Sequence, residues 1–148
     1  MENRYYEIVK IIASNENIAQ FGEFGNGASD EWVKRAQERL KVQFPPSYIW
    51  WLKNYGGGEI HGNEIYSIYE IDFDTVVGGD IVYMNELNRK NLGFSIHQLV
   101  IQENDQGETY YFDLSQIDVN GEAPVYCDIT GDKYANDFFD FLKKKIEE

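Results

Sequence analysis

The residue types that most often carry catalysis or metal binding are few in this chain, and their spacing suits neither task. His61 and His97 are the two histidines, and neither belongs to a zinc-like pattern of ligands. Cys127 alternates with Val125 and Ile129 on an expected strand, which predicts that its thiol faces the core as a structural group. The sequence therefore predicts no metal centre and no thiol nucleophile.

Hydrolase and phosphate-binding motifs are missing as well. No G-x-S-x-G occurs, and neither "GEFGNG" at 22–27 nor "YGGGE" at 55–59 has the order of a nucleotide-binding loop. Paired acids such as Asp72 and Asp74 could hold a cation or share acid–base catalysis, but 26 acids among 148 residues make such pairs frequent by chance. We expect the two glycine runs to be turns, and we expect no enzymatic activity and no cofactor.

Negative charge is concentrated in the C-terminal part of the chain, whose formal net charge is −13. Residues 1–58 contain seven acids and seven bases, whereas residues 59–148 contain 19 acids and six bases. Such a field repels nucleic acid and anionic lipid, and it increases the encounter rate with basic proteins. The alternative explanation is that the charge serves solubility alone.

Composition and the N-terminal residues bear on the cellular compartment. The 43% hydrophobic content is enough for a core, and the single cysteine cannot form an internal disulfide. No apolar run approaches the roughly 18 residues of a membrane span. The acidic start "MENRYYEIVK" is unlike a signal peptide. We therefore expect a cytoplasmic protein with no membrane association.

Helical periodicity dominates the first 58 residues. It predicts a helix over about 1–20, a second helix over 29–42 capped by Ser29, and a third from Pro46 to the glycines at 56–58. The third helix places apolar residues on one face, namely Tyr48, Trp51, Leu52 and Tyr55. Trp50 points away from that face, either as an interface anchor or, as we favour, against the N-terminal helix.

From residue 59 the pattern becomes alternating. Segments 64–72, 98–104, 108–115 and 123–130 are predicted strands, and "NDQG" at 104–107 predicts a hairpin turn. Two further helices are expected, at 80–90 and 134–148. The predicted fold class is α+β: a mostly antiparallel sheet packed with N-terminal and C-terminal helices, in a single domain over 1–148.

Tyrosines and carboxylates share one side of these strands in the expected alternation. Tyr66 and Glu70 lie opposite Ile65 and Ile71, while Tyr111 alternates with buried neighbours. Tyrosine gives large contact area at low entropic cost, and carboxylates bind Lys and Arg, so this face suits a basic protein partner. Alternatively, helices cover both faces and the tyrosines belong to the core. The predicted contact residues are Tyr66, Tyr69, Glu70, Asp72, Asp105, Glu108, Tyr111 and Asp113.

The stretch "LKVQFPPSYIWWLKNYGGGEI", residues 40–60, resembles the hallmark segment of the SUKH superfamily, the Smi/Knr-type immunity proteins of bacterial toxin systems and their fungal relatives. Pro46 matches the motif proline, Tyr48 and Leu52 its apolar positions, and 56–57 its glycine pair. Phe44 departs from the usual leucine, Pro45 stands beside it, and Tyr55 replaces a common asparagine. The strands after residue 100 and the closing helix follow in the family's order, so the resemblance covers about 28–145.

This resemblance implies that residues 44–60 are scaffold and that the protein has no catalytic role. It implies binding and neutralisation of a cognate toxin domain, often a nuclease, inside the producing cell. Nucleases act on polyanions and are commonly basic, so an acidic surface could occupy their substrate groove. The expected partner is therefore a basic C-terminal toxin domain, with the oligomeric state left open. The alternative is an intracellular scaffold or regulator without a toxin, as the fungal relatives suggest.

Overall fold

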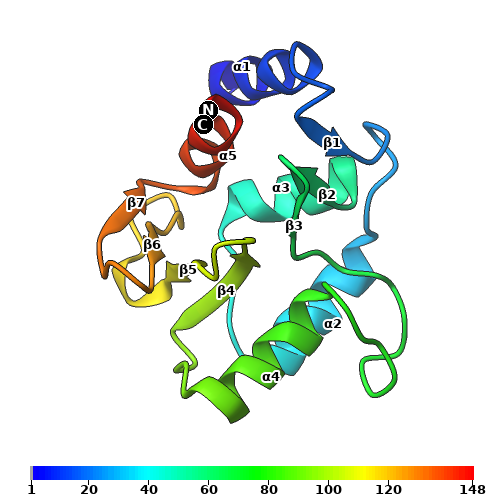
Figure 1. Ribbon diagram of the computed structural model, residues 1–148. Helices are drawn as coiled ribbons and strands as arrows, with labels where there is room; N and C mark the ends of the chain where they lie inside the picture. The colour runs from blue at the N-terminus through cyan, green and yellow to red at the C-terminus, as the bar shows by residue number, and fades with distance from the viewer. Residues whose placement is uncertain (1) are drawn as a thin grey trace.

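Helices and short strands make up the fold of residues 2–148, the part of the chain that the computed structural model describes (Figure 1). The helices are α1 (Glu2–Ala13), α2 (Asp30–Leu40), α3 (Pro46–Tyr55), α4 (Ile81–Leu92) and α5 (Phe138–Glu147). The strands are β1 (Ala19–Phe21), β2 (Gly58–Ile60), β3 (Asn63–Ile65), β4 (Gln98–Glu103), β5 (Thr109–Asp113), β6 (Val125–Cys127) and β7 (Lys133–Ala135). The fold is α+β, as the sequence predicts.

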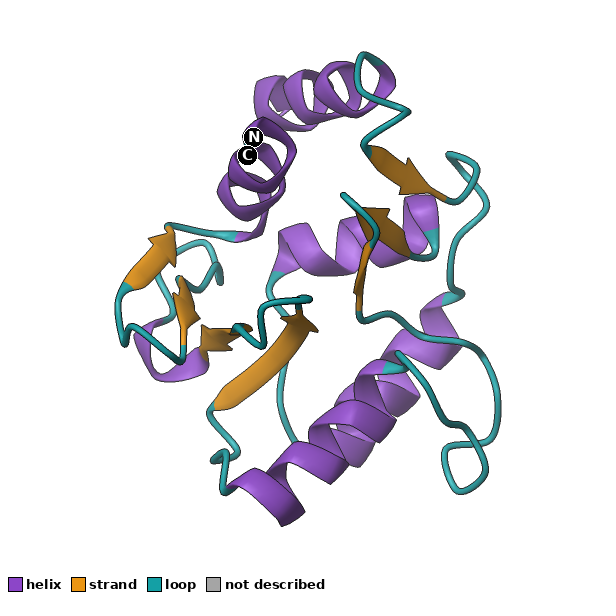
Figure 2. Cartoon of the chain, in the orientation of Figure 1, coloured by secondary structure: helices purple, strands orange, loops and turns teal. Residues whose placement is uncertain are grey.

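The strands form two antiparallel sheets rather than one. β1, β2 and β3 pair in that order, as do β4, β5, β6 and β7. The two sheets meet where the backbone N–H of Tyr66, just after β3, donates to the carbonyl of Ile101 in β4 over 2.8 Å. In the view of Figure 2, the strands of the first sheet lie over and beside the right-hand end of α3, and those of the second lie below it and to its left. The "NDQG" turn joins β4 to β5, as expected, with Gly107 in the left-handed region at φ +79°.

α3 is the centre of the core because its apolar face contacts both sheets and α5. Tyr48 and Trp51 are fully buried. The Tyr48 ring lies 5.8 Å from Phe112 of β5 and 5.2 Å from Phe138 of α5, and Trp51 lies 5.3 Å from Phe21 of β1. Edge-to-face ring pairs of this kind add to the free energy gained by burial. The buried aromatic face of α3 is therefore scaffold.

The Tyr48 hydroxyl holds the backbone at Tyr66, just before the acid-rich residues that follow β3. It donates to the backbone carbonyl of Tyr66 over 2.7 Å, deep inside the protein. Burial, together with the nearby Asp80 charge, raises the pKa of Tyr48 well above its usual value, so the phenol stays neutral and keeps this bond. The segment that follows β3 is thereby held against α3.

The start of α3 has an unusual cap. Pro45 occupies the cap position and offers no side-chain acceptor. Instead, Glu122, distant in sequence and buried, accepts from the backbone N–H of Ser47 at 3.0 Å and from its hydroxyl at 2.6 Å. Burial raises the pKa of Glu122, while the two Ser47 hydrogen bonds and the positive end of the helix favour the carboxylate. This long-range contact links the β5–β6 connection to the central helix.

Several expected helix ends are confirmed. The Ser29 side chain accepts from the N–H of Trp32 at the start of α2, and Gly56 ends α3 in the left-handed region at φ +77°. Trp50 is half-buried between Tyr5 of α1 and Phe139 of α5, at ring distances of 5.2 and 5.4 Å. The packing interpretation of Trp50 is thus confirmed.

The first and last helices are shorter than the sequence predicts. α1 ends at Ala13, and β1 occupies part of the expected 1–20 helix, because the carbonyl of Asn15 accepts from the N–H groups of Ile18 and Ala19 and turns the chain. α5 begins at Phe138 rather than Tyr134, since Asp137 caps it through the N–H of Asp140. Tyr134 belongs instead to β7, which pairs with β6.

The expected alternation fails in two places. Only β3 forms within 64–72, and Ile65, Tyr66, Ser67 and Ile68 are all buried because the chain runs between the sheets and α3 there. Ser67 bridges in parallel to Asp80 rather than to a neighbouring strand. Ile129 is 62% exposed because β6 ends at Cys127 and the chain turns. Cys127 itself is buried, as predicted.

Truncating the α3 face should destabilise the whole fold. Leu52→Ala removes a fully buried side chain and leaves a cavity, so we expect a loss of about 2–5 kcal/mol. Urea denaturation followed by circular dichroism should show a lower midpoint with an unchanged slope. Lys34→Ala, on the exposed face of α2, serves as the control and should leave the midpoint within experimental error.

Removing the Glu122 carboxylate should weaken α3 from a distance. Glu122→Ala leaves the N–H and hydroxyl of Ser47 without their buried acceptor, at a cost of about 1–3 kcal/mol for each unsatisfied group. Amide hydrogen exchange at Ser47 and Tyr48 should accelerate more than the global loss of stability explains. The double variant Glu122→Ala, Ser47→Ala should recover part of the loss. No recovery would contradict the capping role.

Candidate functional site

Residues 69–79, here called the acidic loop, form a surface loop between β3 and α4. They contain neither helix nor strand and extend beyond α2 and α4 in this view (Figure 2). The two ends of the loop are close, because Ile81 N–H donates to the carbonyl of Ser67 over 2.7 Å. Asp80 is fully buried: one carboxylate oxygen caps α4, and the other accepts from the N–H of Tyr69 at 3.0 Å. One side chain therefore fixes both the helix and the loop.

Two apolar side chains anchor the acidic loop in the core, and two others are exposed on its surface. Phe73 and Val76 are buried, and the Phe73 ring packs edge-on against Trp32 of α2 at 5.4 Å. Ile71 and Val77, by contrast, are 48% and 64% exposed. Exposed apolar side chains on an anchored loop are a common feature of binding surfaces.

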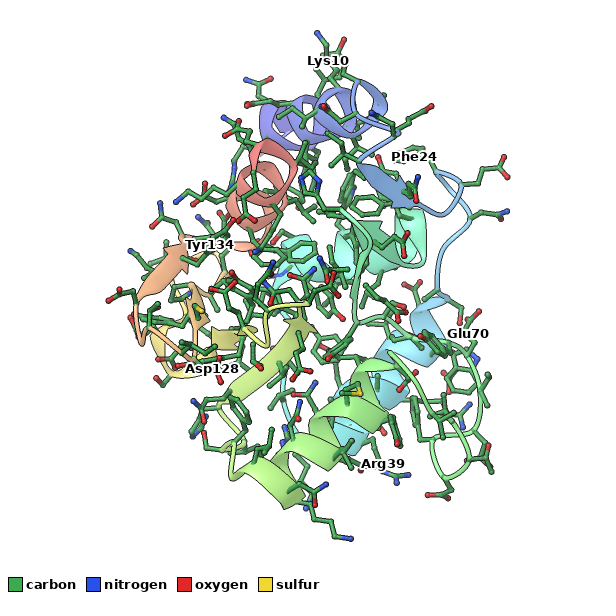
Figure 3. The ribbon with its side chains drawn as sticks, in the orientation of Figure 1. Lys10, Phe24, Arg39, Glu70, Asp128 and Tyr134 are labelled. Carbon is green, nitrogen blue, oxygen red and sulfur yellow. The ribbon has the colours of Figure 1, made fainter. Side chains whose placement is uncertain are left out.

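Two acids of the loop are fixed by the backbone. The Glu70 carboxylate accepts from the N–H of Ser29 at 3.2 Å, where α2 begins, and Figure 3 places Glu70 beside that junction. Glu70 also has φ +57°, which costs a residue with a Cβ about 1–3 kcal/mol. Asp72 folds the loop tip, accepting from the N–H of Asp74 through its side chain and from Val76 through its carbonyl. Backbone hydrogen bonds therefore orient both carboxylates.

Beside the acidic loop lies a shallow hollow of about 530 Å³, here called the glycine depression. Its floor is the turn after α3, and its walls come from β3 and the start of the loop. The lining residues are Gly22, Tyr55, Gly56, Gly57, Gly58, Glu64, Ser67, Ile68, Tyr69 and Ile71. Glu64 is the one charged residue among them.

Glu64 is held rigidly at this wall. The hydroxyl of Tyr69 donates to its Oε2 over 2.5 Å and itself accepts from the N–H of Gly79 at 2.9 Å. A Cβ at Gly79 would lie 2.2 Å from Glu64 Oε1, so only glycine leaves room for the carboxylate. Burial, then the hydrogen bond to Glu64 and its charge, raise the pKa of Tyr69 to about 12. The phenol therefore stays protonated and keeps orienting the carboxylate.

Further acids surround Glu64. Glu59 of β2 lies directly opposite it across the strand pair, an arrangement that destabilises a sheet. Burial, followed by the charges of Glu103 and Glu64, raises the pKa of Tyr66 to about 12, which places both carboxylates near that phenol. Asp105 is next to them, since its N–H donates to the side-chain oxygen of Asn63 at 3.0 Å. These acids form one negative surface with the acidic loop.

Few bases neutralise this surface. Residues 59–132 contain 15 acids and two bases, Arg89 and Lys90. Arg89 donates to the carbonyl of Leu40 and belongs to the contact between α4 and α2. Among the described residues, ion pairs reach two acids of this stretch, Asp74 and Glu86, both through Arg39 (labelled in Figure 3). Glu64, Glu70 and Asp72 have no ion pair within residues 2–148.

The sequence-predicted contact residues fall into separate groups. Tyr69, Glu70 and Asp72 lie on the acidic loop, and Asp105 lies on the nearby hairpin. Tyr66 is only 6% exposed, so its side chain is core and the expectation of an exposed ring there is wrong. The physical reason is that the chain after β3 passes inside the protein.

The other three predicted residues lie in β5 or immediately before it. Glu108 accepts from Asn104 and is half-buried inside the hairpin. The Tyr111 ring stacks on Tyr126 of β6 at 6.0 Å. Asp113 is partly buried, which alone would raise its pKa, but hydrogen bonds from the Ser115 and Gln116 side chains keep the pKa below its usual value. Tyr111 and Asp113 make a second tyrosine-containing patch on β5, whereas Glu108 lies on the other face of the strand, beside Tyr110 and Cys127.

Sequence reasoning missed Glu59 and Glu64. The segment "GGGEIHGNEI" contains a short hairpin with two acids placed symmetrically about its His–Gly turn, which is the signal that could have identified them. Within residues 2–148, no group of three or more His, Cys, Asp or Glu side chains is arranged to hold a metal ion. None of the helices in that range is long and apolar enough to cross a membrane.

Asp80 should couple the acidic loop to α4. Asp80→Ala removes the helix cap, at a cost of about 0.5–2 kcal/mol, and frees the N–H of Tyr69. Amide exchange should accelerate at both Tyr69 and Val82. Asp137→Ala, which removes a cap from α5 instead, is the matched control and should leave Tyr69 unchanged. Unchanged exchange at Tyr69 in Asp80→Ala would contradict this coupling.

Comparison with known families identifies the family of the chain. A SUKH family model described as SMI1-KNR4 cell-wall matches residues 30–142. The match begins with α2, includes α3 and the acidic loop, and extends into α5. It is consistent with a non-catalytic scaffold of the immunity-protein type that has a protein partner. Because the match covers more than half of the sequence, the chain belongs to the SMI1-KNR4 (SUKH) family.

Proposed function

We propose that this chain is an immunity protein that binds and neutralises a cognate bacterial toxin domain. The observation that carries the proposal is the acidic loop, where Glu70 and Asp72 accept backbone hydrogen bonds, have no ion pair to residues 2–148, and lie next to exposed Ile71 and Val77. Family membership supports a protein partner. An anchored apolar surface with unpaired carboxylates is suited to a basic one.

The charge distribution supports a basic partner, which we propose to be a nuclease-type toxin met in the cytoplasm of the producing cell. A nuclease groove that binds phosphates carries an excess of Lys and Arg, and these attract the 15 acids of residues 59–132 over a distance. The attraction raises the association rate before any close contact forms. Blocking of the groove then needs no chemistry by the immunity protein.

The proposed contact surface is centred on Tyr69, Glu70, Asp72 and Asp105. These residues lie on the acidic loop and on the hairpin beside β3. Tyr111 and Asp113 on β5 form a proposed second contact area, and Glu108 lies apart from them, inside the β4–β5 hairpin. Interfaces of standard size bury about 800 Å² on each partner, which is larger than a single loop provides.

Neutralising the loop acids should slow association with the toxin domain encoded beside the gene. Glu70→Gln and Asp72→Asn keep both hydrogen-bond acceptors but remove two charges. We expect a lower association rate and a smaller dependence on salt, because steering by charge is reduced. Stopped-flow association at two salt concentrations measures both.

The control is a double variant that loses the same two charges at β7 and α5, across the molecule from the acidic loop (Figure 1). Asp132→Asn, before β7, and Glu147→Gln, at the end of α5, should leave the association rate nearer to that of the original protein. Equal slowing by both double variants would remove the acidic loop from the interface. Failure of the unaltered protein to bind or inhibit the toxin would favour the scaffold or regulator alternative.

A further inference from the structure

We propose that the glycine depression is a receptor for one arginine side chain of the partner, with the guanidinium paired to Glu64 and stacked on Tyr69. This inference rests on the proposed function and adds to it the chemistry of one contact. Glu64 is outside the residues that the sequence predicted for partner binding. Its position is set by the Tyr69 hydroxyl and by the close approach of Gly79.

The shape and composition of the depression suit a long cationic side chain. The Gly56–Gly58 turn makes its floor without side chains. Ile71, which is 48% exposed, offers apolar surface for the three methylene groups of an arginine. The negative charge stands at the wall, beside an aromatic ring.

Charge complementarity identifies the occupant. Glu64 forms no ion pair within residues 2–148, and Glu59 opposite it adds a second negative charge. A neighbouring groove between α1 and β1 shares Gly22 and Tyr55 with the depression, and its charged lining residues, Glu16 and Glu23, are acids as well. A cation entering the depression therefore meets negative charge on each side.

Arginine fits better than lysine for a geometric reason. Its guanidinium is planar, pairs side-on with a carboxylate and stacks on aromatic rings, whereas an ammonium is a compact, strongly hydrated point charge. Tyr69 and Glu64 are joined by their own hydrogen bond and so present a ring and a carboxylate at fixed spacing. The rigid arrangement reduces the entropy lost on binding.

The test uses the protein alone, so it is separate from the test of the proposed function. Amide NMR spectra are recorded during titration with Nα-acetyl-arginine amide, Nα-acetyl-lysine amide and the neutral analogue Nα-acetyl-citrulline amide. We expect saturable shifts at Gly56, Gly57, Gly58 and Tyr69 with the arginine probe, and much smaller ones with the other two. Equal affinity for the lysine or citrulline probe would overturn the assignment to arginine.

Substitution of Glu64 tests whether its carboxylate binds the arginine probe. Glu64→Gln keeps the size of the side chain and should weaken the arginine probe about tenfold, since a hydrogen bond to a charged group contributes roughly that much. Glu147→Gln, exposed at the end of α5, is the matched control and should bind as before. Unchanged binding by Glu64→Gln, or shifts spread evenly over all exposed acids, would overturn the inference.

Binding to the toxin domain gives the second readout. If the depression receives a partner arginine, Glu64→Gln weakens the complex while Glu147→Gln does not. Toxin binding that is unaffected by Glu64→Gln would overturn the role of the depression and leave the immunity function intact. If the unaltered protein does not bind the toxin at all, that result counts against the proposed function. The titration with the arginine probe then still tests the depression separately.

Discussion

Burial of the aromatic face of α3 against the two sheets is the constraint on which the rest of the structure depends. Its aromatic face touches both sheets and α5, and the hydroxyl of Tyr48 must find a partner in an interior without water. That partner is the carbonyl of Tyr66, which directs the chain after β3 through the core. Glu122 satisfies the start of the same helix. The position of the acidic loop follows from these buried bonds.

The acidic surface is held at some cost to stability. Glu70 has a backbone conformation that disfavours any residue with a Cβ, and Glu59 faces Glu64 across a strand pair. Neither feature helps the isolated chain to fold. Buried anchors such as Phe73, Val76 and Asp80 offset the cost and keep the loop in one conformation. A surface fixed before binding loses less entropy when a partner arrives, which is a physical reason for retaining it.

One tyrosine connects the fold to the candidate arginine receptor. Tyr69 receives a hydrogen bond from the loop end at Gly79 and gives one to Glu64 on β3. The loop, the sheet and the depression therefore share a single hydrogen-bonded chain. The second patch, with Tyr111 stacked on Tyr126, belongs to the other sheet and does not depend on this chain. The two areas can contribute to binding independently.

The sequence by itself determined the fold class, the α3 face, the Ser29 cap, the hairpin at 104–107 and the excess of acids, because each follows from residues close together in the chain. It also placed Tyr69, Glu70 and Asp72 as candidates. Only the tertiary structure decided that Tyr66 is core, that Glu122 caps α3, and that Glu64 joins Tyr69 beside a glycine turn. These three features depend on contacts between segments that are far apart in the sequence, and the periodicity of neighbouring residues cannot predict such contacts.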